Sequence, residues 1–193
     1  MIKKTESDIP PIYQFKVTLK DSKPPIWRRI QVPANITLHR LHLILQVVMG
    51  WGNYHLYGFR IKGQDFGEPD PDGDEFDLVN SHRTKLNKVS TKEKTQFMYD
   101  YDFGDNWEHI IVLEKILPVD SDMRYPICIK GKRACPPEDC GGIWGYYDLL
   151  EIMKKPKHKE YKEMMEWVGG PFDPEEFDIN EINSMLNRRK IKS

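Results

Sequence analysis

Three absences in this 193-residue sequence narrow the classes of protein to which it can belong. No apolar run approaches the roughly 20 residues that a membrane-spanning helix needs. The first residues are mostly polar and charged, so they do not predict a secretory signal. Cysteine is scarce and odd in number, at three residues, which does not favour a disulfide framework. Together these absences predict a cytoplasmic protein with no membrane partner.

An excess of charge of either sign is also lacking. The sequence has 29 basic and 30 acidic residues, for a net charge of −1. No overall basic field therefore predicts nucleic-acid binding. Local basic runs, such as Arg28-Arg29, 130–133, 154–159 and 188–192, leave nucleic acid as an alternative partner. Acidic residues lie close to these runs, which favours a solvated surface.

The hydrophobic pattern predicts strands first and helices last. Strands are expected at 12–19, 26–32 and 55–61, with two more in a hairpin around Tyr99. A helix is expected after Thr37, its predicted N-cap, with its end at Gly50. After a loop over 125–142 that is rich in Pro, Gly and Cys, three helices are expected at 145–153, 159–168 and 178–188.

This order predicts an α+β fold rather than alternating βαβ units. We expect a mostly antiparallel sheet with a β-β-α-β opening, for which a β-grasp-like arrangement is one candidate, and C-terminal helices packed on the sheet. The expected organisation is a single domain over 1–193. Within it, 1–118 is mainly sheet plus one helix, and 119–193 is the Cys/Pro/Gly loop and helices.

The stretch from Tyr99 to His109 predicts a hairpin with a two-residue loop, at Gly104-Asp105 or Asp105-Asn106. In either register, even positions of the first strand face odd positions of the second. The face predicted to be core carries Tyr99, Tyr101, Phe103, Ile110 and Val112. The other face carries Met98, Asp100, Asp102, Trp107, His109 and Ile111.

That second face contains the candidate catalytic residues, Asp100, Asp102 and His109. Two carboxylates beside an imidazole suit acid–base chemistry or a divalent transition-metal ion, and Trp107 is a candidate binding residue beside them. The alternative is that the carboxylates bond turn amides and that the imidazole is a satisfied sheet residue.

Three further residues are candidates for the same binding site: His42, His55 and Trp51. His39 and His42 are neighbours on the first predicted helix, and His55 opens the next strand just past the end of that helix. If the helix packs on the sheet face that bears His109, these residues predict a His42–His55–His109 cluster. The alternative is a histidine at the edge of the core that donates to a carbonyl.

Two other segments have spacings that resemble metal sites. Cys128, Cys135 and Cys140 lack a Cys-x-x-Cys pair but offer three thiols for zinc or another divalent metal, with free buried thiols as the alternative. The acidic segment 68–74 matches the start of a calcium loop. Its twelfth position is Val79 rather than the required Glu, so an exposed loop is favoured.

Four blocks follow one another between residues 12 and 188. The first is Trp-Arg-Arg-Ile at 27–30 with Leu41-His42, Trp51, His55-Leu56 and Phe59, and the second is Tyr-Asp-Phe-Gly-Asp-Asn-Trp at 101–107 with His109. The third is Ala-Cys-Pro-Pro-Glu-Asp-Cys-Gly-Gly at 134–142 with Gly145-Tyr146. The fourth is Phe-Asp-Pro-Glu at 172–175 with Phe177-Asp178. In this order they resemble the plasmid pRiA4b ORF-3-like family. The resemblance implies an association with mobile elements, because the family includes resolvase-like passenger proteins of insertion elements. It implies no particular reaction.

Resolvase chemistry itself is not predicted by the residues. A serine recombinase needs a nucleophilic serine, arginines that clamp the phosphate and a helix-turn-helix reader, whereas the serines here lie in polar, turn-like segments. We expect a binding or accessory domain for an unidentified protein or small-molecule ligand. The alternatives are a metal-dependent enzyme that uses Asp100, Asp102 and His109, and a nucleic-acid-binding protein.

Overall fold

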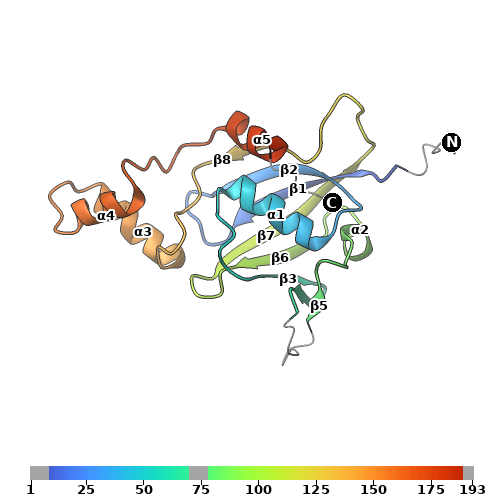
Figure 1. The fold of residues 1–193 in the computed structure, drawn as a ribbon, viewed down its shortest axis with the longest axis horizontal. Helices are drawn as coiled ribbons and strands as arrows, with labels where there is room; N and C mark the ends of the chain where they lie inside the picture. The colour runs from blue at the N-terminus through green and yellow to red at the C-terminus, as the bar shows by residue number, and fades with distance from the viewer. Residues whose placement is uncertain (1–8, 70–77, 189–193) are drawn as a thin grey trace.

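The computed structural model describes residues 9–69 and 78–188 (Figure 1). Eight strands form one sheet in the order β5-β4-β3-β6-β7-β1-β2-β8. The strands are β1 Ile12–Leu19, β2 Trp27–Pro33, β3 Tyr57–Ile61, β4 Gln64–Gly67, β5 Val79–Asn80, β6 Gln96–Tyr101, β7 Trp107–Leu117 and β8 Ile127–Lys132. The helices are α1 Leu38–Met49, α2 Leu86–Val89, α3 Gly142–Met153, α4 Tyr161–Val168 and α5 Ile179–Arg188. The α+β prediction is confirmed.

Helix α1 begins and ends at the residues that the sequence predicted. The Oγ1 atom of Thr37 accepts a hydrogen bond from the backbone N–H of Arg40 at 3.1 Å, which satisfies one of the free donors of the first turn. The helix ends at Gly50, whose left-handed φ of 88° is accessible to glycine without a Cβ penalty. Its N–H donates to the carbonyl of Gln46. Both ends of α1 are therefore fixed by local chemistry.

The sheet is antiparallel except where β4 and β5 pair in parallel. The chain opens in the predicted β-β-α-β order, but β6 and β7 lie between β1 and β3 in the sheet. The two longest strands, β7 and β1, pair in the interior of the sheet. The predicted loop over 125–142 is wrong in part, because residues Ile127–Lys132 form β8, which pairs along the edge of β2. The short strands β4 and β5 were not predicted.

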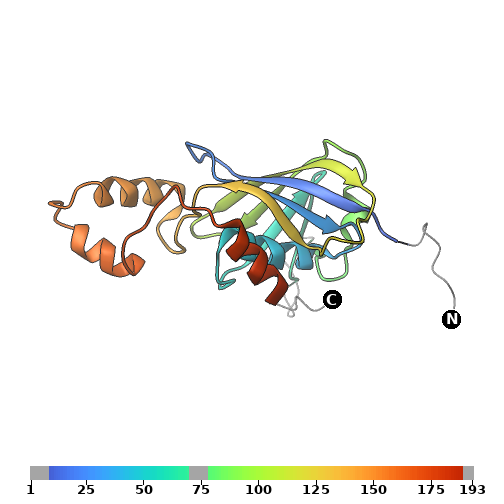
Figure 2. The same cartoon turned by 90° about the horizontal axis from the view of Figure 1, so that it is seen from above.

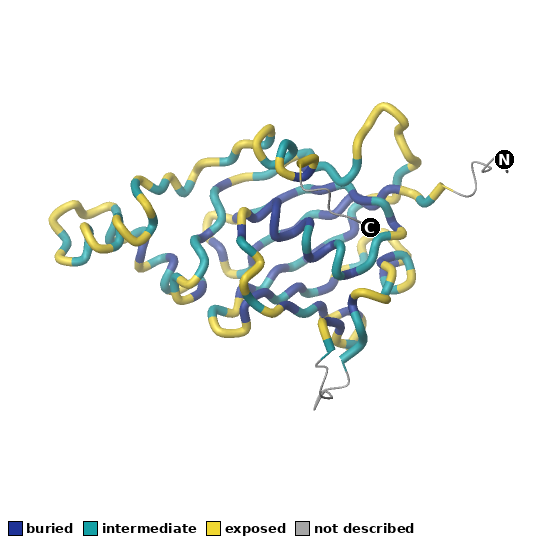
Figure 3. The backbone as a smooth tube through the Cα atoms, viewed as in Figure 1, coloured by how far each residue is buried: buried dark blue, intermediate teal, exposed yellow. Residues whose placement is uncertain are grey.

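Helices α1 and α5 lie on one face of the sheet and leave the opposite face open (Figure 2). The core between α1 and the sheet combines aliphatic side chains of the helix with aromatic side chains of the strands. Figure 3 shows this central region as the most continuously buried part of the chain. In the part of the chain that the structure describes, no helix is both long enough and apolar enough to cross a membrane.

The three predicted C-terminal helices are present, but they pack differently. Helix α5 contacts β8 and α1, and Leu186 lies in the core. Helices α3 and α4 contact each other and extend beyond the end of the sheet (Figures 1 and 2). The buried side chain of Tyr146 anchors α3 to the main core. Only part of the predicted helical region therefore covers the sheet.

The predicted register of the Tyr99 hairpin is wrong, because its loop has five residues rather than two. The loop runs from Asp102 to Asn106, and the strands pair Tyr99 with His109 and Tyr101 with Trp107. Asp102 and Asn106 have φ values of 56° and 55°, a region that Asp and Asn tolerate better than most residues. An odd loop length shifts the second strand by one residue and reverses its two faces.

The reversal changes which side chains are buried. Trp107, His109 and Ile111 join Tyr99 and Tyr101 in the core. Ile110 and Val112, which we predicted to be buried with them, pair with residues of the opposite face and are only partly covered. The ring of Phe103, at the tip of the hairpin, is exposed. Asp100 pairs with Glu108 on the open face, so Asp100 and His109 lie on opposite sides of the sheet.

Candidate functional site

Three side chains with metal-binding groups meet at the end of the sheet, where the hairpin tip, the segment after α1 and the loop before α3 come together. The Nε2 atom of His55 lies 3.1 Å from Oδ1 of Asp139 and 3.7 Å from Oδ2 of Asp102. One ligand-type atom from each of these residues lies within 4.8 Å of the other two. We call this group the hairpin-tip cluster. One imidazole and two carboxylates form a donor set that suits a divalent transition-metal ion.

Asp102 is held in place by the turn that reversed the hairpin. Its Oδ1 atom accepts a hydrogen bond from the backbone N–H of Gly104 at 3.0 Å, and its carbonyl accepts from Asn106 at 2.6 Å. This arrangement is an Asx turn, in which a short side chain satisfies the backbone of the loop. It leaves Oδ2 facing His55, so the turn itself aims one carboxylate oxygen into the cluster.

Glu138 ties the loop before α3 to the rest of the site. Its two carboxylate oxygens accept hydrogen bonds from the Tyr101 hydroxyl at 2.5 Å and from the Gly52 N–H at 2.7 Å. Burial and the neighbouring Glu138 carboxylate raise the pKa of Tyr101 above its ordinary value, so its hydroxyl remains a donor. These contacts place Asp139, the next residue, opposite His55.

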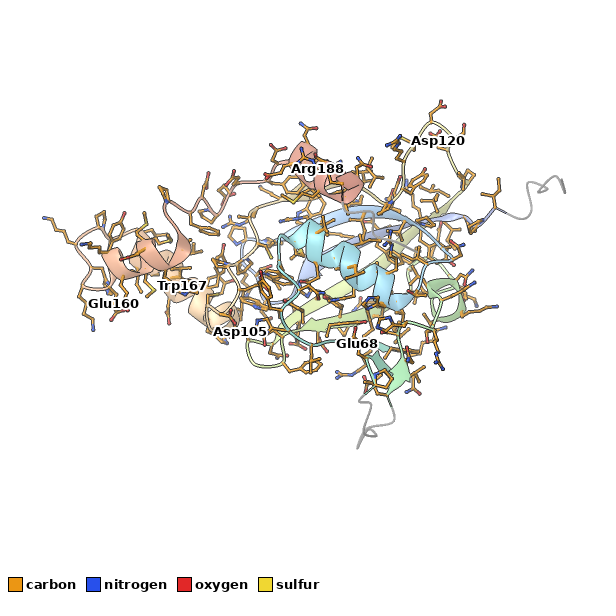
Figure 4. The ribbon with its side chains drawn as sticks, in the orientation of Figure 1. Glu68, Asp105, Asp120, Glu160, Trp167 and Arg188 are labelled. Carbon is orange, nitrogen blue, oxygen red and sulfur yellow. The ribbon has the colours of Figure 1, made fainter. Side chains whose placement is uncertain are left out.

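The same loop also docks on the hairpin tip. The N–H of Gly141 donates to Oδ2 of Asp105 at 3.1 Å. A Cβ atom at Gly142 would collide with the carbonyl oxygen of Asp105, and φ at Gly142 is 67°. Glycine is needed here because the two backbones approach each other directly. Figure 4 labels Asp105 at this contact.

The two tryptophans that we predicted as binding residues form the packed base of the site. The ring of Trp51 stacks on that of Tyr101 at 5.0 Å, and its indole N–H donates to the Pro136 carbonyl at 3.1 Å. The Trp107 ring lies 5.9 Å from the Trp51 ring and is 1% exposed. Both side chains therefore support the hairpin-tip cluster from below instead of facing solvent.

His42 lies in a buried hydrogen-bond network behind the cluster. Its Nδ1 atom lies 2.8 Å from the Tyr99 hydroxyl, and its Nε2 atom lies 2.6 Å from Oδ1 of Asn53. Gln46 donates to the same tyrosine hydroxyl and accepts from the Asn53 backbone N–H. Burial lowers the pKa of His42 to about 3, so the imidazole stays neutral.

His109 is separate from this network and from the predicted histidine cluster. Its Nδ1 donates to the carbonyl of Tyr99 at 3.3 Å, and the side chain is fully buried against the edge of the Trp51 ring. Burial lowers its pKa to about 4. The predicted His42–His55–His109 cluster does not form. His42 bonds the Tyr99 hydroxyl, His109 bonds the Tyr99 backbone carbonyl, and His55 faces two carboxylates instead.

The candidate catalytic set of Asp100, Asp102 and His109 is likewise divided. Asp100 lies on the open face, where burial and the neighbouring Glu108 raise its pKa. His109 lies in the core on the other face, and only Asp102 of the three joins the hairpin-tip cluster. The set cannot act as one site because the sheet separates its members.

The cysteines do not form the three-thiol zinc site that their spacing allowed. All three are free thiols, and none belongs to a group of three metal-binding side chains that converge within 4.8 Å in the described residues. Burial raises the pKa of Cys140 to about 12 and also raises that of Cys128 and Cys135. These thiols remain protonated packing residues.

Several of the basic residues considered for nucleic-acid binding are paired within the fold. The guanidinium of Arg28 is buried and donates to the carbonyls of Val48, Trp27 and Lys132. Arg29 forms a two-point hydrogen bond with Glu114, and Arg133 pairs with Glu175. The tail from residue 189 and most of the acidic segment 68–74 lie outside the described residues.

Sequence reasoning identified two members of the hairpin-tip cluster, His55 and Asp102, and missed the third. Asp139 and its neighbour Glu138 appeared in the sequence only as part of the block at 134–142. The one feature of the sequence that could have drawn attention to these two acids is their position in a block with two cysteines and two glycines. Their convergence with residue 55 depends on how that block docks.

Comparisons with known proteins agree with the resemblance in the sequence. The model of the plasmid pRiA4b ORF-3-like protein family matches residues 11–181. The chain is 36% identical over 177 residues to the uncharacterized protein y4hQ of Sinorhizobium fredii, and the match covers 91% of each chain. The crystal structure of protein of unknown function MM3350 from Methanosarcina mazei Go1 has the same fold, with a TM-score of 0.80 and 43% sequence identity. It covers 90% of this chain and 97% of that one. The chain belongs to the plasmid pRiA4b ORF-3-like family.

Proposed function

We propose that this protein is an accessory binding domain that holds a divalent metal ion at the hairpin-tip cluster. In this proposal, His55, Asp102 and Asp139 are the ligands. The observation that carries the proposal is the convergence of one imidazole and two carboxylates within 4.8 Å, from three segments that are distant in the sequence. The ion would supply a positive charge to which an anionic group of a ligand can bind.

The surroundings of the cluster support a cation rather than an anion. Asp105 and Glu138 lie in the same two segments as Asp102 and Asp139 and are fixed by backbone donors. Two carboxylates beside the His55 imidazole, with two more in the same segments, create a negative potential that attracts a cation. The Asp139 side chain is 66% exposed, so water or a ligand can reach an ion bound there.

We also propose that the chain acts in the cytoplasm as one domain over residues 1–193. Free thiols at all three cysteines suit a reducing compartment. The main core contains residues from Tyr13 to Leu186, which supports one folding unit. The link to mobile elements stays a prediction from the family resemblance.

Titration with Mn²⁺ tests the metal site, because free Mn²⁺ has a paramagnetic resonance signal that is lost on binding. Asp102→Asn keeps the size of the side chain and the turn bond to Gly104, yet removes the negative charge. Asp139→Asn changes an exposed carboxylate. We expect each variant to weaken Mn²⁺ binding by at least about tenfold, equivalent to about 1.4 kcal/mol.

Asp65→Asn is the matched control. Asp65 is an exposed carboxylate that pairs with Arg60 on β3, away from the hairpin tip. It should bind Mn²⁺ as the unaltered protein does. Failure of the unaltered protein to bind Mn²⁺, or equal binding by all three variants, would contradict the proposed function.

A further inference from the structure

A second group of metal-binding side chains lies at the other end of α1. His39 is in the first turn of that helix, Glu68 follows β4 and His82 follows β5. Oε1 of Glu68 lies 3.3 Å from Nδ1 of His39 and 3.0 Å from Nε2 of His82. Ligand-type atoms of the three residues converge within 4.8 Å. We call this group the helix-start cluster; Figure 4 labels Glu68.

The separations match those between the ligands of a small metal ion. With zinc–ligand bonds of about 2.0–2.1 Å, neighbouring ligand atoms in a tetrahedron are about 3.3–3.4 Å apart. The two measured nitrogen–oxygen distances are close to that spacing. An ion therefore fits between the three groups with only small adjustments of side chains.

His39 is supported by buried polar side chains behind it. The Tyr57 hydroxyl lies 2.8 Å from Nδ1 of His39 and 2.7 Å from Oγ of Ser81. If Nδ1 gives its lone pair to a metal ion, the Tyr57 hydroxyl keeps Ser81 as a partner. Binding an ion at Nδ1 therefore does not leave this buried hydroxyl without a partner.

The imidazoles of His39 and His82 are held together, and His39 favours its neutral form. Their rings stack at 3.7 Å with 19° between the planes. Burial and the nearby His82 lower the pKa of His39 below its ordinary value. A neutral imidazole is the form that binds metal, so no proton has to be displaced from it near neutral pH.

A groove adjoins this cluster and gives an ion room for further ligands. Its volume is about 600 Å³, and both His39 and His82 line it. Other lining residues come from the start of α1 and from the segment before β8, including Thr37, Leu43 and Tyr125. Ligand sites in proteins are concave and have volumes in this range.

We propose that His39, Glu68 and His82 bind a divalent transition-metal ion of the zinc class, whose open coordination positions face this groove. Two imidazoles and one carboxylate favour Zn²⁺, Co²⁺ or Fe²⁺ over Mg²⁺ or Ca²⁺. This site is independent of the one proposed at the hairpin tip, because the two share no residue.

Co²⁺ is the test probe because its visible absorption strengthens when four or five ligands replace its octahedral water shell. Asp139→Asn protein is titrated so that the hairpin-tip cluster contributes little. We expect one Co²⁺ per chain at this site with a new visible band. In the same background, His82→Ala should abolish the band or weaken binding by at least about tenfold. Glu68→Gln, which keeps the shape of the side chain, should also weaken binding.

His158→Ala is the matched control, because His158 lies between α3 and α4 and takes no part in either cluster. It should leave the Co²⁺ spectrum and affinity unchanged. The proposal is overturned if Asp139→Asn protein gives no visible band. A band that persists in the His82→Ala and Glu68→Gln variants would also overturn it. Neither result would bear on Mn²⁺ binding at the hairpin tip.

Discussion

The two clusters lie toward opposite ends of α1 and differ in how the chain builds them. The hairpin-tip cluster rests on turn chemistry: an Asx turn aims Asp102, and the loop before α3 docks through Glu138 and glycine. The helix-start cluster has no such motif, because His39, Glu68 and His82 come from three separate elements. Turn chemistry can be read in a sequence, whereas the convergence of isolated polar residues cannot.

The clusters also differ in the ions that they suit. One imidazole with two carboxylates at the hairpin tip favours harder ions such as Mn²⁺ more than two imidazoles with one carboxylate do. Between them lies the buried network of His42, Tyr99 and Asn53. The 12 residues of α1 span about 18 Å, so this network is the physical link between the two ends. The following predictions test whether the ends are independent.

The largest expected effect is acid destabilisation through the two buried histidines. In the folded protein the pKa of His42 is about 3 and that of His109 is about 4, against an ordinary 6.5. The unfolded chain therefore binds more protons than the folded protein below pH 6.5. Stability should therefore be complete above pH 6.5 and fall as the pH drops towards 4. Between pH 7 and pH 5 the loss should be about 2 kcal/mol per histidine. Urea unfolding at several pH values measures it, and His109→Gln should have a shallower pH dependence.

His42→Ala should come next, with a loss of about 3 kcal/mol. The change removes the partner of the Asn53 side-chain oxygen and one of the two partners of the Tyr99 hydroxyl, which keeps Gln46. It also opens a cavity where the ring stacks on Tyr57 at 3.6 Å. Urea unfolding measures the loss. We also expect weaker metal binding at both ends of α1; weakening at one end only would show that the network supports just that cluster.

Tyr101→Phe should affect the hairpin tip alone. It removes the hydroxyl that donates to Glu138 and accepts from the Tyr54 N–H, at a cost of about 1–2 kcal/mol. Mn²⁺ affinity should fall because Asp139 follows Glu138 directly. Co²⁺ binding at the helix-start cluster serves as the internal control, and a matching loss there would contradict local control.

Thr37→Ala should affect the helix-start cluster and leave the hairpin-tip cluster unchanged. Loss of the N-cap bond to the Arg40 N–H should cost about 1 kcal/mol in urea unfolding. Because His39 lies in the first turn, Co²⁺ affinity should decrease. Mn²⁺ affinity is expected to stay as it is, and Thr37→Ser, which keeps the capping oxygen, should restore both stability and Co²⁺ binding.

The smallest effect is the coupling between the two ends. In a double-mutant cycle of Thr37→Ala and Tyr101→Phe, the two losses of stability should add to within about 0.5 kcal/mol, as is usual for distant sites. A larger coupling energy in urea unfolding would show that α1 transmits changes from one cluster to the other, and the two sites would then not be independent.

Much of the fold was predictable because it depends on local patterns. Strict alternation of apolar residues set β1, and Thr37 and Gly50 set the ends of α1. The hairpin register was not predictable by the same means. A Gly-Asp-Asn run fits a two-residue turn, but the positive φ values of Asp102 and Asn106 extend the loop to five residues. The strand β8 was missed because its sequence, Ile-Cys-Ile-Lys-Gly-Lys, gains its pairing only from β2.

The candidate site was predictable in location but not in membership. Sequence reasoning placed it on the hairpin beside the first helix, and it identified Asp102 and His55. It could not assign Asp139 to the site, because that depends on the docking of the Glu138 loop. Sequence reasoning also placed Asp100 and His109 on the same face of the sheet. A shift of one residue in the strand pairing puts them on opposite faces.

By itself, the sequence determined the α+β class, the family, most of the strands and helices and the turn residues at the hairpin tip. These follow from periodicity, capping and left-handed turn positions, which act over a few residues. Only the tertiary structure decided which side of the sheet each hairpin residue occupies and which polar residues meet at either end of α1. Those outcomes depend on whether the hairpin loop has an odd or an even number of residues and on contacts between segments that are tens of residues apart. A local sequence pattern specifies neither.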